Sequence, residues 1–178
     1  MSTRSIFNHP GVGTQPPDFG TQPIDSCRRP IHLDAMLLVH GTTVEIDGKG
    51  VLLRGPSGSG KSDLALRLMD RGAKLVADDQ TVLVAEHGHL LASPPDGIAG
   101  LMEVRGMGIV RVEYGTGVPL AVVVDLVSPQ EVERMPEPSV VTYLDIALPS
   151  FCLSPFEASA SAKVRLAALS PTRDIMRS

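Results

Sequence analysis

The sequence predicts an α/β domain in which a central mixed β-sheet with flanking helices carries a phosphate-binding loop. Three observations lead to this fold class. Short aliphatic runs recur along the chain and are broken by glycine, proline or aspartate, which is typical of strands in a sheet. The run GPSGSGKS at 55–62 has the form of a phosphate-binding loop. Apolar residues at helical spacing follow it, so a strand, a loop and a helix are expected in succession.

Short β-branched or aliphatic runs predict the strands of the sheet. These runs are 36–40, 42–47, 49–55, 74–79, 81–86, 89–93, 118–127 and 140–149. Between neighbouring runs, Asp47-Gly48 and His87-Gly88 predict tight hairpins. The segment 99–117 is punctuated by glycines and is expected to be a loop.

Two helices are expected beside this sheet. The first follows the loop over 62–72, where apolar residues stand at helical spacing and Gly72 is the expected C-cap. The second is alanine-rich and is expected over 154–170. Its start has a capping-box pattern, which consists of Ser154 at the N-cap, Pro155 at the first helical position and Glu157 at N3.

Length and composition bound the domain organisation. A chain of 178 residues is long enough for one domain with its own core. Residues 1–30 are rich in proline, repeat the run GTQP and have no helix or strand periodicity, so they predict a disordered tail. The folded domain is expected over 31–170, and 171–178 is expected to be a flexible C-terminus.

Several classes of protein do not fit the composition. A net charge of -4, a pI near 5.7 and an aromatic content of 3% argue against a nucleic-acid-binding protein. No apolar run approaches the length of about 18 residues that a membrane span needs. No uninterrupted hydrophobic segment follows Arg4, so a secretory signal is not expected. Cys27 and Cys152 have no metal-ligand spacing and are expected to be reduced thiols of a cytoplasmic protein.

The loop is expected to bind the phosphates of a nucleotide. Its glycines allow backbone N–H groups to approach phosphate oxygens, and the N-terminus of the following helix adds partial positive charge. Lys61 is expected to reach the terminal phosphates, while the hydroxyl of Ser62 is offered to Mg²⁺. The nucleotide-binding residues are Gly55, Pro56, Ser57, Gly58, Ser59, Gly60, Lys61 and Ser62.

Two adjacent carboxylates, Asp78 and Asp79, end the strand expected at 74–79. A strand that abuts the loop strand would end beside the phosphates. One aspartate would then bind Mg²⁺ or its waters, and the other would take a proton from an attacking hydroxyl. A hydrolase that orients water more often uses glutamine or glutamate, so two aspartates favour a P-loop kinase that transfers phosphate to an alcohol. Taken alone, the pair also fits two solvated acids at a strand end.

Three further residues are candidates for the same site. In MEVRGMGI at 102–109, Glu103 suits metal binding and Arg105 suits phosphate clamping. Taken alone, this pair is more typical of a surface ion pair. His40, directly before Gly41, is by itself more typical of a turn than of a catalyst.

Together these segments resemble the HPr kinase/phosphorylase family. VHG at 39–41, GPSGSGKS, RGAKLVADD and MEVRGMGI stand in the family's order and spacing, and the resemblance covers roughly 31–169. It implies a P-loop kinase-type domain that phosphorylates a serine of the phosphocarrier protein HPr, with Mg²⁺ and with ATP or pyrophosphate as the donor. It also implies reverse phosphorolysis of phosphoserine-HPr, regulation of carbohydrate metabolism and the phosphotransferase system, and a homo-oligomer, typically a hexamer.

The resemblance also implies a role for each candidate residue. Asp79 is the proton acceptor in phosphorylation and the proton donor in reversal, and His40 contacts phosphate in the active site. The implied catalytic residues are His40, Lys61, Asp79 and Arg134, the last of these in the run VERMPEP. The implied magnesium ligands are Ser62 and Glu103, and the supporting residues are Asp78 and Arg105.

The sequence departs from the family pattern at three places. The proline-rich tail leaves no room for the separate N-terminal domain of the longer members, so the short proteobacterial form with the catalytic domain alone is expected. Asp63 stands where the family commonly has glutamate. The segment 150–163 lacks the Pro-Gly-Arg-Asn run that longer members use in dephosphorylation. A weaker phosphorylase activity is therefore expected.

Two other functions remain as alternatives. One is a P-loop kinase of a small metabolite, although no arginine-rich lid segment stands out. The other is a catalytically silent ATP-binding regulator, against which the intact Lys61, Asp79 and Glu103 argue. A GTPase is not favoured, because the sequence has no Asn-Lys-x-Asp run that would recognise guanine.

Overall fold

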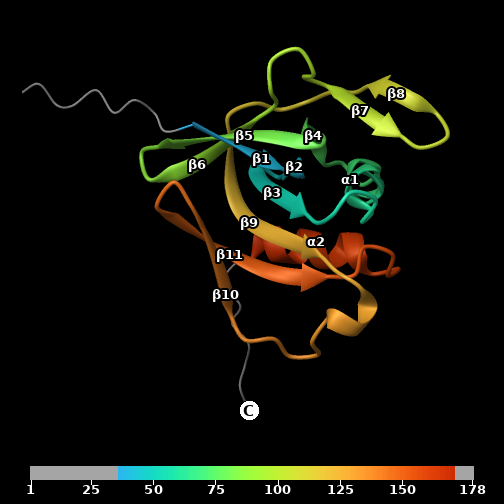
Figure 1. Cartoon of the computed structure of the whole chain (residues 1–178), viewed down its shortest axis with the longest axis vertical. Coiled ribbons are helices and arrows are strands. Elements are labelled where there is room, and N and C mark those ends of the chain that lie inside the picture. The colour runs from blue at the N-terminus through green and yellow to red at the C-terminus, as the bar shows by residue number, and fades with distance from the viewer. Residues whose placement is uncertain (1–35, 171–178) are drawn as a thin grey trace, which may run out of the picture. The chain divides into compact units, whose positions relative to one another are not determined.

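The structure is a computed structural model that describes residues 36–170. The tail predicted at 1–30 and the flexible C-terminus predicted at 171–178 lie outside these described residues, so both stay predictions. Within the described part of the chain the predicted α/β class is confirmed. A curled mixed sheet and a few helices make up this part (Figure 1).

Residues 36–170 form mostly strands, with a few short helices between or after them. The strands are β1 (Met36–His40), β2 (Thr42–Ile46), β3 (Lys49–Arg54), β4 (Lys74–Ala77), β5 (Gln80–Glu86), β6 (His89–Ser93), β7 (Leu101–Val104), β8 (Gly108–Arg111), β9 (Val118–Leu126), β10 (Ser139–Tyr143) and β11 (Ile146–Leu153). The helices are α1 (Lys61–Met69), α2 (Ala160–Leu169) and the short 3-10 helix η1 (Pro129–Glu131).

Strand β3 leads into the phosphate-binding loop and lies in the middle of the sheet. It pairs in parallel with β9 and in antiparallel orientation with β2, and β4 lies beyond β2, antiparallel to it. On the other side of β9, β11 pairs with it in parallel. Therefore β3, β4, β9 and β11 run in one direction, and the segments that follow them all start at the same edge of the sheet.

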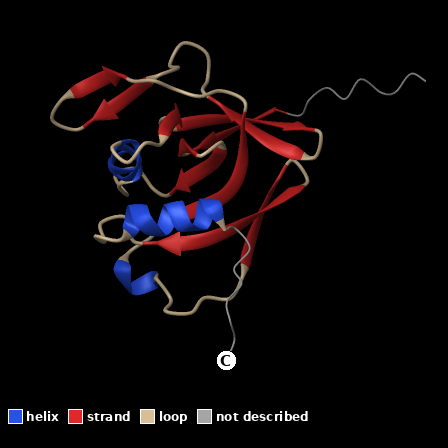
Figure 2. Cartoon of the chain, turned by 180° about the vertical axis from the view of Figure 1, so that it is seen from behind, coloured by secondary structure: helices blue, strands red, loops and turns tan. Residues whose placement is uncertain are grey.

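Both helices cover one face of the sheet. Leu64 and Leu68 of α1 and Val164 of α2 pack with Leu53 of β3 in one buried cluster. Its neighbour Leu52 points to the opposite face and belongs to a second buried cluster. Figure 2 shows α2 lying across the strands, and in both views α1 lies between the β7–β8 hairpin and α2.

The two predicted tight hairpins are confirmed. Asp47 and Gly48, with φ values of 50° and 77°, join β2 to β3. His87 and Gly88, with φ values of 50° and 80°, join β5 to β6. Left-handed backbone at both central residues is the turn geometry whose twist matches paired antiparallel strands.

The segment 99–117 was expected to be a loop, and this was wrong for its middle part. β7 and β8 pair there as an antiparallel hairpin, with Glu103 opposite Ile109. The inward residues Met102 and Val110 pack against the core that also holds α1. This burial stabilises a two-stranded hairpin that the frequent glycines of the sequence concealed.

The prediction of one strand over 140–149 was also wrong. The chain forms two paired strands, β10 and β11, that are joined at Leu144 and Asp145. Both residues have left-handed backbone, with φ values of 47° and 63°. Leucine seldom adopts this conformation, and Asp145 alone is a weak turn signal, so the turn was not expected from the sequence.

The helix expected over 154–170 begins later, at Ala160. Arg67 of α1 donates a hydrogen bond to the carbonyl oxygen of Pro155, which ties this segment to the first helix. Glu157 pairs with Lys163 and therefore does not complete the predicted capping box. A tertiary contact has overridden a local helix-start signal.

The helix expected over 62–72 is confirmed with shifted ends. It begins at Lys61 and ends at Met69, and its C-cap is Asp70 and not Gly72. Gly72 has a φ of 92°, and the N–H of Ala73 donates to the oxygen of Leu68 at 3.1 Å. The left-handed glycine thus closes the end of the helix two residues after the assigned cap.

Replacing Leu68 by alanine should destabilise the domain by about 2–5 kcal/mol, because it leaves a cavity between α1 and the sheet. Leu68 is 0% exposed, whereas Leu66 on the same helix is 39% exposed. The matched variant Leu66→Ala should cost less than about 1 kcal/mol. Urea denaturation of both variants measures the difference, and equal losses would contradict this account of the core.

Candidate functional site

The lysine of the phosphate-binding loop donates hydrogen bonds back to the start of the loop. Lys61 is only 6% exposed, and its Nζ donates to the carbonyl oxygens of Gly55 at 2.9 Å and Pro56 at 3.0 Å. Gly58 and Gly60 have φ values of 78° and 90°, which allow the loop to turn back into α1. The ammonium group is therefore held at the loop, where phosphate oxygens would be its natural partners.

The loop has the features that a phosphate ligand needs. Among residues 36–170, Ser59 Oγ is the one buried side-chain nitrogen or oxygen atom without a hydrogen-bond partner. A Cβ at Gly55 would lie 2.6 Å from this Oγ, so only glycine allows this close approach. A buried hydroxyl that lacks a partner is costly, and a phosphate oxygen would satisfy it. The donor set of the loop thus fits a nucleotide.

The carboxylate of Asp78 connects three separate elements at this edge of the sheet. Its Oδ1 accepts hydrogen bonds from Thr42 Oγ1 and Ser62 Oγ, both at 2.9 Å, and its Oδ2 accepts one from the N–H of Glu103 at 3.1 Å. Because Ser62 donates its proton to Asp78, the lone pairs of its oxygen remain available to a metal ion. Asp78 therefore orients the hydroxyl of Ser62, which is predicted to bind Mg²⁺.

Asp78 lies beside the loop although β4, the strand before it, is not the direct neighbour of β3 that was expected. β4 does not abut β3, because β2 lies between them. β2 is antiparallel to both strands, so its first residue, Thr42, lies at the edge where β3 and β4 end. Thr42 could not be singled out from the sequence, because a threonine at the start of a strand is common.

Asp79 is the more exposed carboxylate of the two neighbouring aspartates. Its side chain is 72% exposed, and its Oδ1 lies 3.3 Å from Nδ1 of His40, which is 51% exposed. The backbone of Asp79 has a φ of 63°, and its carbonyl oxygen accepts the N–H of Gly41 at 2.9 Å. The structure thus brings His40 and Asp79 together and leaves the carboxylate accessible to a hydroxyl group.

Glu103 lies beside this pair of aspartates, at the middle of the β7–β8 hairpin. Its backbone reaches Asp78, and its side chain is exposed. Among the described residues no group of three or more His, Cys, Asp or Glu side chains could hold a metal by itself. Ser62 and Glu103 fit Mg²⁺ instead, because this ion keeps several waters and is commonly shared between one or two protein ligands and phosphates. Arg105 follows in the exposed turn of the hairpin.

A second ionic contact lies where β3 and β9 end, and sequence reasoning missed it. Arg54 donates from Nε and Nη2 to Asp125 at 2.8 and 2.7 Å, and from Nη1 to the hydroxyl of Tyr143 at 2.8 Å. The hydrogen bond to Asp125 raises the pKa of Arg54 above its ordinary value. Asp125 thus faces an arginine and not the loop. The one sequence signal was a charged residue near the end of an otherwise apolar strand.

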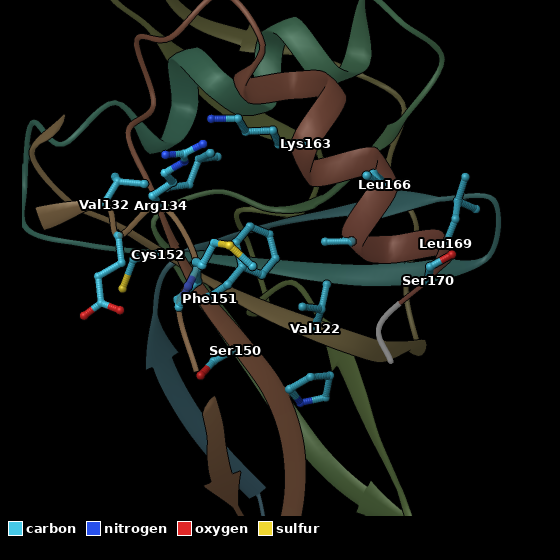
Figure 3. Close-up of a pocket in the computed structure, with 16 residues that line it drawn as sticks. Val122, Val132, Arg134, Ser150, Phe151, Cys152, Lys163, Leu166, Leu169 and Ser170 are labelled. Carbon is cyan, nitrogen blue, oxygen red and sulfur yellow. The ribbon is translucent and has the colours of Figure 1, made fainter. Parts of the chain in front are cut away.

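Arg134 lies on the loop after η1, at a groove with a volume of about 860 Å³. Figure 3 shows Arg134 and Lys163 at one end of this groove, with Phe151, Leu166 and Leu169 among the residues that line the rest. The charged side chains of Arg134, Lys163 and Glu133 therefore line part of the groove, and apolar side chains line most of the rest. The role that the resemblance implies for Arg134 stays a prediction.

The fold and the site together define an α/β domain in which a glycine-rich loop of the phosphate-binding form lies at one edge of a curled mixed sheet. Residues 32–147 match the family model described as the HPr Serine kinase C-terminal domain. The chain belongs to this family.

Individual relatives agree with this assignment. The HPr kinase/phosphorylases of Limosilactobacillus reuteri (strain DSM 20016) and Bacillus mycoides (strain KBAB4) are 46% and 51% identical over 82 residues, which are 44% of this chain and 26% of each relative. The matched region thus spans about a quarter of these curated relatives. The solved structure of the Hpr(Ser) kinase/phosphatase from Coxiella burnetii matches with a TM-score of 0.68 and 26% identity, over 76% of this chain and 95% of that chain.

The bidentate pair of Arg54 and Asp125 should contribute to stability more than an exposed ion pair does. In a double-mutant cycle with Arg54→Met and Asp125→Leu, we expect a coupling free energy of about 1.5–3 kcal/mol, because charged hydrogen bonds are partly shielded there. The same cycle on the exposed pair Lys74 and Glu113, 2.9 Å apart, should give a clearly smaller coupling free energy, because solvent screens this pair. Similar coupling in the two cycles, measured by urea denaturation, would contradict this ranking.

Proposed function

We propose that this protein is a serine kinase that transfers a phosphoryl group from ATP, or from pyrophosphate, to the phosphocarrier protein HPr. The observation that carries the proposal is the difference between two neighbouring carboxylates, one held by hydrogen bonds and one exposed. Asp78 is held by Thr42, Ser62 and Glu103, beside the two residues that would bind Mg²⁺. Asp79 remains exposed, and its carboxylate lies 3.3 Å from His40. Transfer of phosphate to an alcohol needs one group that positions the metal ligands and another that accepts the proton of the hydroxyl.

The donor phosphates would lie in the loop. Backbone N–H groups at the start of α1 and the ammonium of Lys61 would bind their oxygens and stabilise the charge that moves to the leaving group. Mg²⁺ held by Ser62 and Glu103 would neutralise charge on the β- and γ-phosphates. The loop thereby fixes the γ-phosphorus at the edge of the sheet where Asp79 lies.

The acceptor hydroxyl would reach the γ-phosphorus from the side of Asp79. As the serine oxygen forms its bond to phosphorus, the bond to the β–γ bridging oxygen breaks and ADP leaves. The proton of the hydroxyl passes to the Asp79 carboxylate, and His40, 3.3 Å away, helps to place this carboxylate. In the reverse direction Asp79 returns the proton to the serine oxygen.

The open acceptor side favours a protein substrate over a small metabolite. A kinase of small metabolites encloses its acceptor, whereas Asp79 is 72% exposed. On the nearby hairpin, Met107 and Ile109 are 76% and 73% exposed. Ile109 pairs with Glu103 across the hairpin, so an exposed apolar side chain lies on the same face as the proposed metal ligand. Such a surface suits contact with a protein.

The identity of the protein substrate rests on the relatives. The curated relatives are named HPr kinase/phosphorylase, and the solved structure is titled Hpr(Ser) kinase/phosphatase. We extend this substrate to the present chain, together with a cytoplasmic location, a homo-oligomer, and a role in regulating carbohydrate metabolism. None of the helices within residues 36–170 is long and apolar enough to cross a membrane.

One assay tests the proposal. Purified protein is incubated with Mg²⁺, ATP and HPr, and the intact mass of HPr should increase by one phosphate. The control Lys61→Met should lose at least about 100-fold in rate, because it lacks the charge that stabilises the moving phosphoryl group. If HPr stays unmodified while a small metabolite is consumed, the site belongs to a metabolite kinase. If nucleotide binds without any turnover, the protein is a silent regulator.

The two aspartates should differ in which measurement they change. Asp79→Asn should lower kcat by about 10²- to 10⁴-fold through loss of the proton acceptor, with little effect on ATP binding or on Tm. Asp78→Asn should raise the Mg²⁺ concentration needed for half-maximal rate and should lower Tm, because the amide cannot accept all of the hydrogen bonds described above. Identical profiles for the two variants would contradict separate roles.

The reverse reaction should be weaker than the forward reaction. In place of the Pro-Gly-Arg-Asn run, Lys163 and Arg165 are the nearby cations, and both have carboxylate partners, Glu157 and Asp47. Neither is therefore available to grip phosphoserine-HPr without losing an ion pair. Phosphoserine-HPr, Mg²⁺ and millimolar phosphate should release pyrophosphate more slowly than HPr is phosphorylated. Equal rates would show that the run is dispensable.

A further inference from the structure

Phe156 is an exposed aromatic side chain beside the phosphate-binding loop. Aromatic residues are only 3% of the sequence, and the ring of Phe156 is 71% exposed. The ring contacts the last glycine of the loop: a Cβ at Gly60 would lie 2.9 Å from Cζ of Phe156. The exposed ring is therefore accessible to a ligand bound at the loop.

Phe156 is held in this place by contacts with α1. The carbonyl oxygen of the preceding Pro155 accepts a hydrogen bond from Arg67, and Arg67 also pairs with Asp63 at 2.8 Å. Gly60, Asp63 and Arg67 lie on one side of α1, since they are spaced by three and four residues. The segment with Phe156 therefore runs along the side of α1 that starts at the loop.

Phe156 and the carboxylates of Asp78 and Asp79 lie on opposite sides of the phosphate-binding loop. Asp78 follows β4, which lies two strands from β3 on the side of β2. Phe156 follows β11, which lies two strands from β3 on the side of β9. The loop after β3 is thus between them. In Figure 1, α1 likewise lies between the β7–β8 hairpin, which carries Glu103, and the start of α2.

We propose that Phe156 is the platform on which the base of the nucleotide stacks. This inference rests on the proposed use of ATP. A triphosphate that places its γ-phosphate at Asp78, Asp79 and Glu103 and its other phosphates in the loop has its base at the opposite end. The exposed ring at that end offers the flat apolar surface that a base needs. Gly60 at the ring contact allows the ring to lie directly against the loop.

Comparison of ligands with and without a base tests the platform. The dissociation constants of ATP and of tripolyphosphate, each with Mg²⁺, are measured by calorimetry. Phe156→Ala should weaken ATP binding about tenfold, which is the effect of losing one base-stacking contact. The same variant should leave tripolyphosphate binding within about twofold, because that ligand has no base. Phe156→Tyr should keep ATP binding near that of the unmodified protein, since tyrosine retains the ring.

The control is Val140→Ala, which trims another exposed apolar side chain, on β10 (69% exposed). It should change neither dissociation constant. Equal weakening of ATP and tripolyphosphate in Phe156→Ala would overturn the proposal, because the ring would then only support the loop. Unchanged ATP binding would overturn it as well, and a raised KM for HPr in the same variant would assign the ring to the protein substrate.

The platform and the proposed function can fail separately. If HPr is not phosphorylated but Phe156→Ala loses ATP and keeps tripolyphosphate, the platform stands and the substrate assignment falls. If HPr is phosphorylated and Phe156→Ala binds ATP normally, the kinase assignment stands and the platform is wrong.

Discussion

The site depends on the hydrogen bonds that converge on one carboxylate, that of Asp78. Through Thr42, Ser62 and Glu103 it joins the start of β2, the start of α1 and the β7–β8 hairpin. These elements are distant from one another in sequence. A carboxylate that accepts several hydrogen bonds is held in one orientation, and it holds its donors in turn. The neighbouring Asp79 remains exposed, while Asp78 is held by its three hydrogen-bond donors.

The direction of the strands decides what gathers around this carboxylate. Because β3, β4, β9 and β11 run the same way, the loop, the two aspartates, Asp125 and the segment with Phe156 all begin at one edge of the sheet. The two helices cover a single face, so α1 presents its N-terminus at that edge. The charge of Asp125 is taken up by Arg54. Asp125 is therefore paired with an arginine, whereas Asp78 and Asp79 follow β4 and contact Ser62 and His40.

Local sequence signals predicted the elements well wherever packing agreed with them. The two hairpin turns, the loop and α1 follow from glycine positions and apolar spacing, and each is present. The errors occurred where tertiary contacts outweighed the local sequence signals. Ser154, Pro155 and Glu157 have the signals of a helix start, yet Pro155 is held by Arg67 and the helix begins only at Ala160. Burial of Met102 likewise turned an apparent loop into a hairpin.

The sequence by itself determined the fold class, the phosphate-binding loop, the pair of aspartates and the family, because each depends on residue types at fixed local spacing. Only the tertiary structure decided how the two aspartates differ, that Thr42 takes part in the site, and that Asp125 faces Arg54. It also decided that Phe156 lies against the loop. These facts depend on which strands are neighbours and in which direction they run, and strand order comes from long-range packing that no local pattern records.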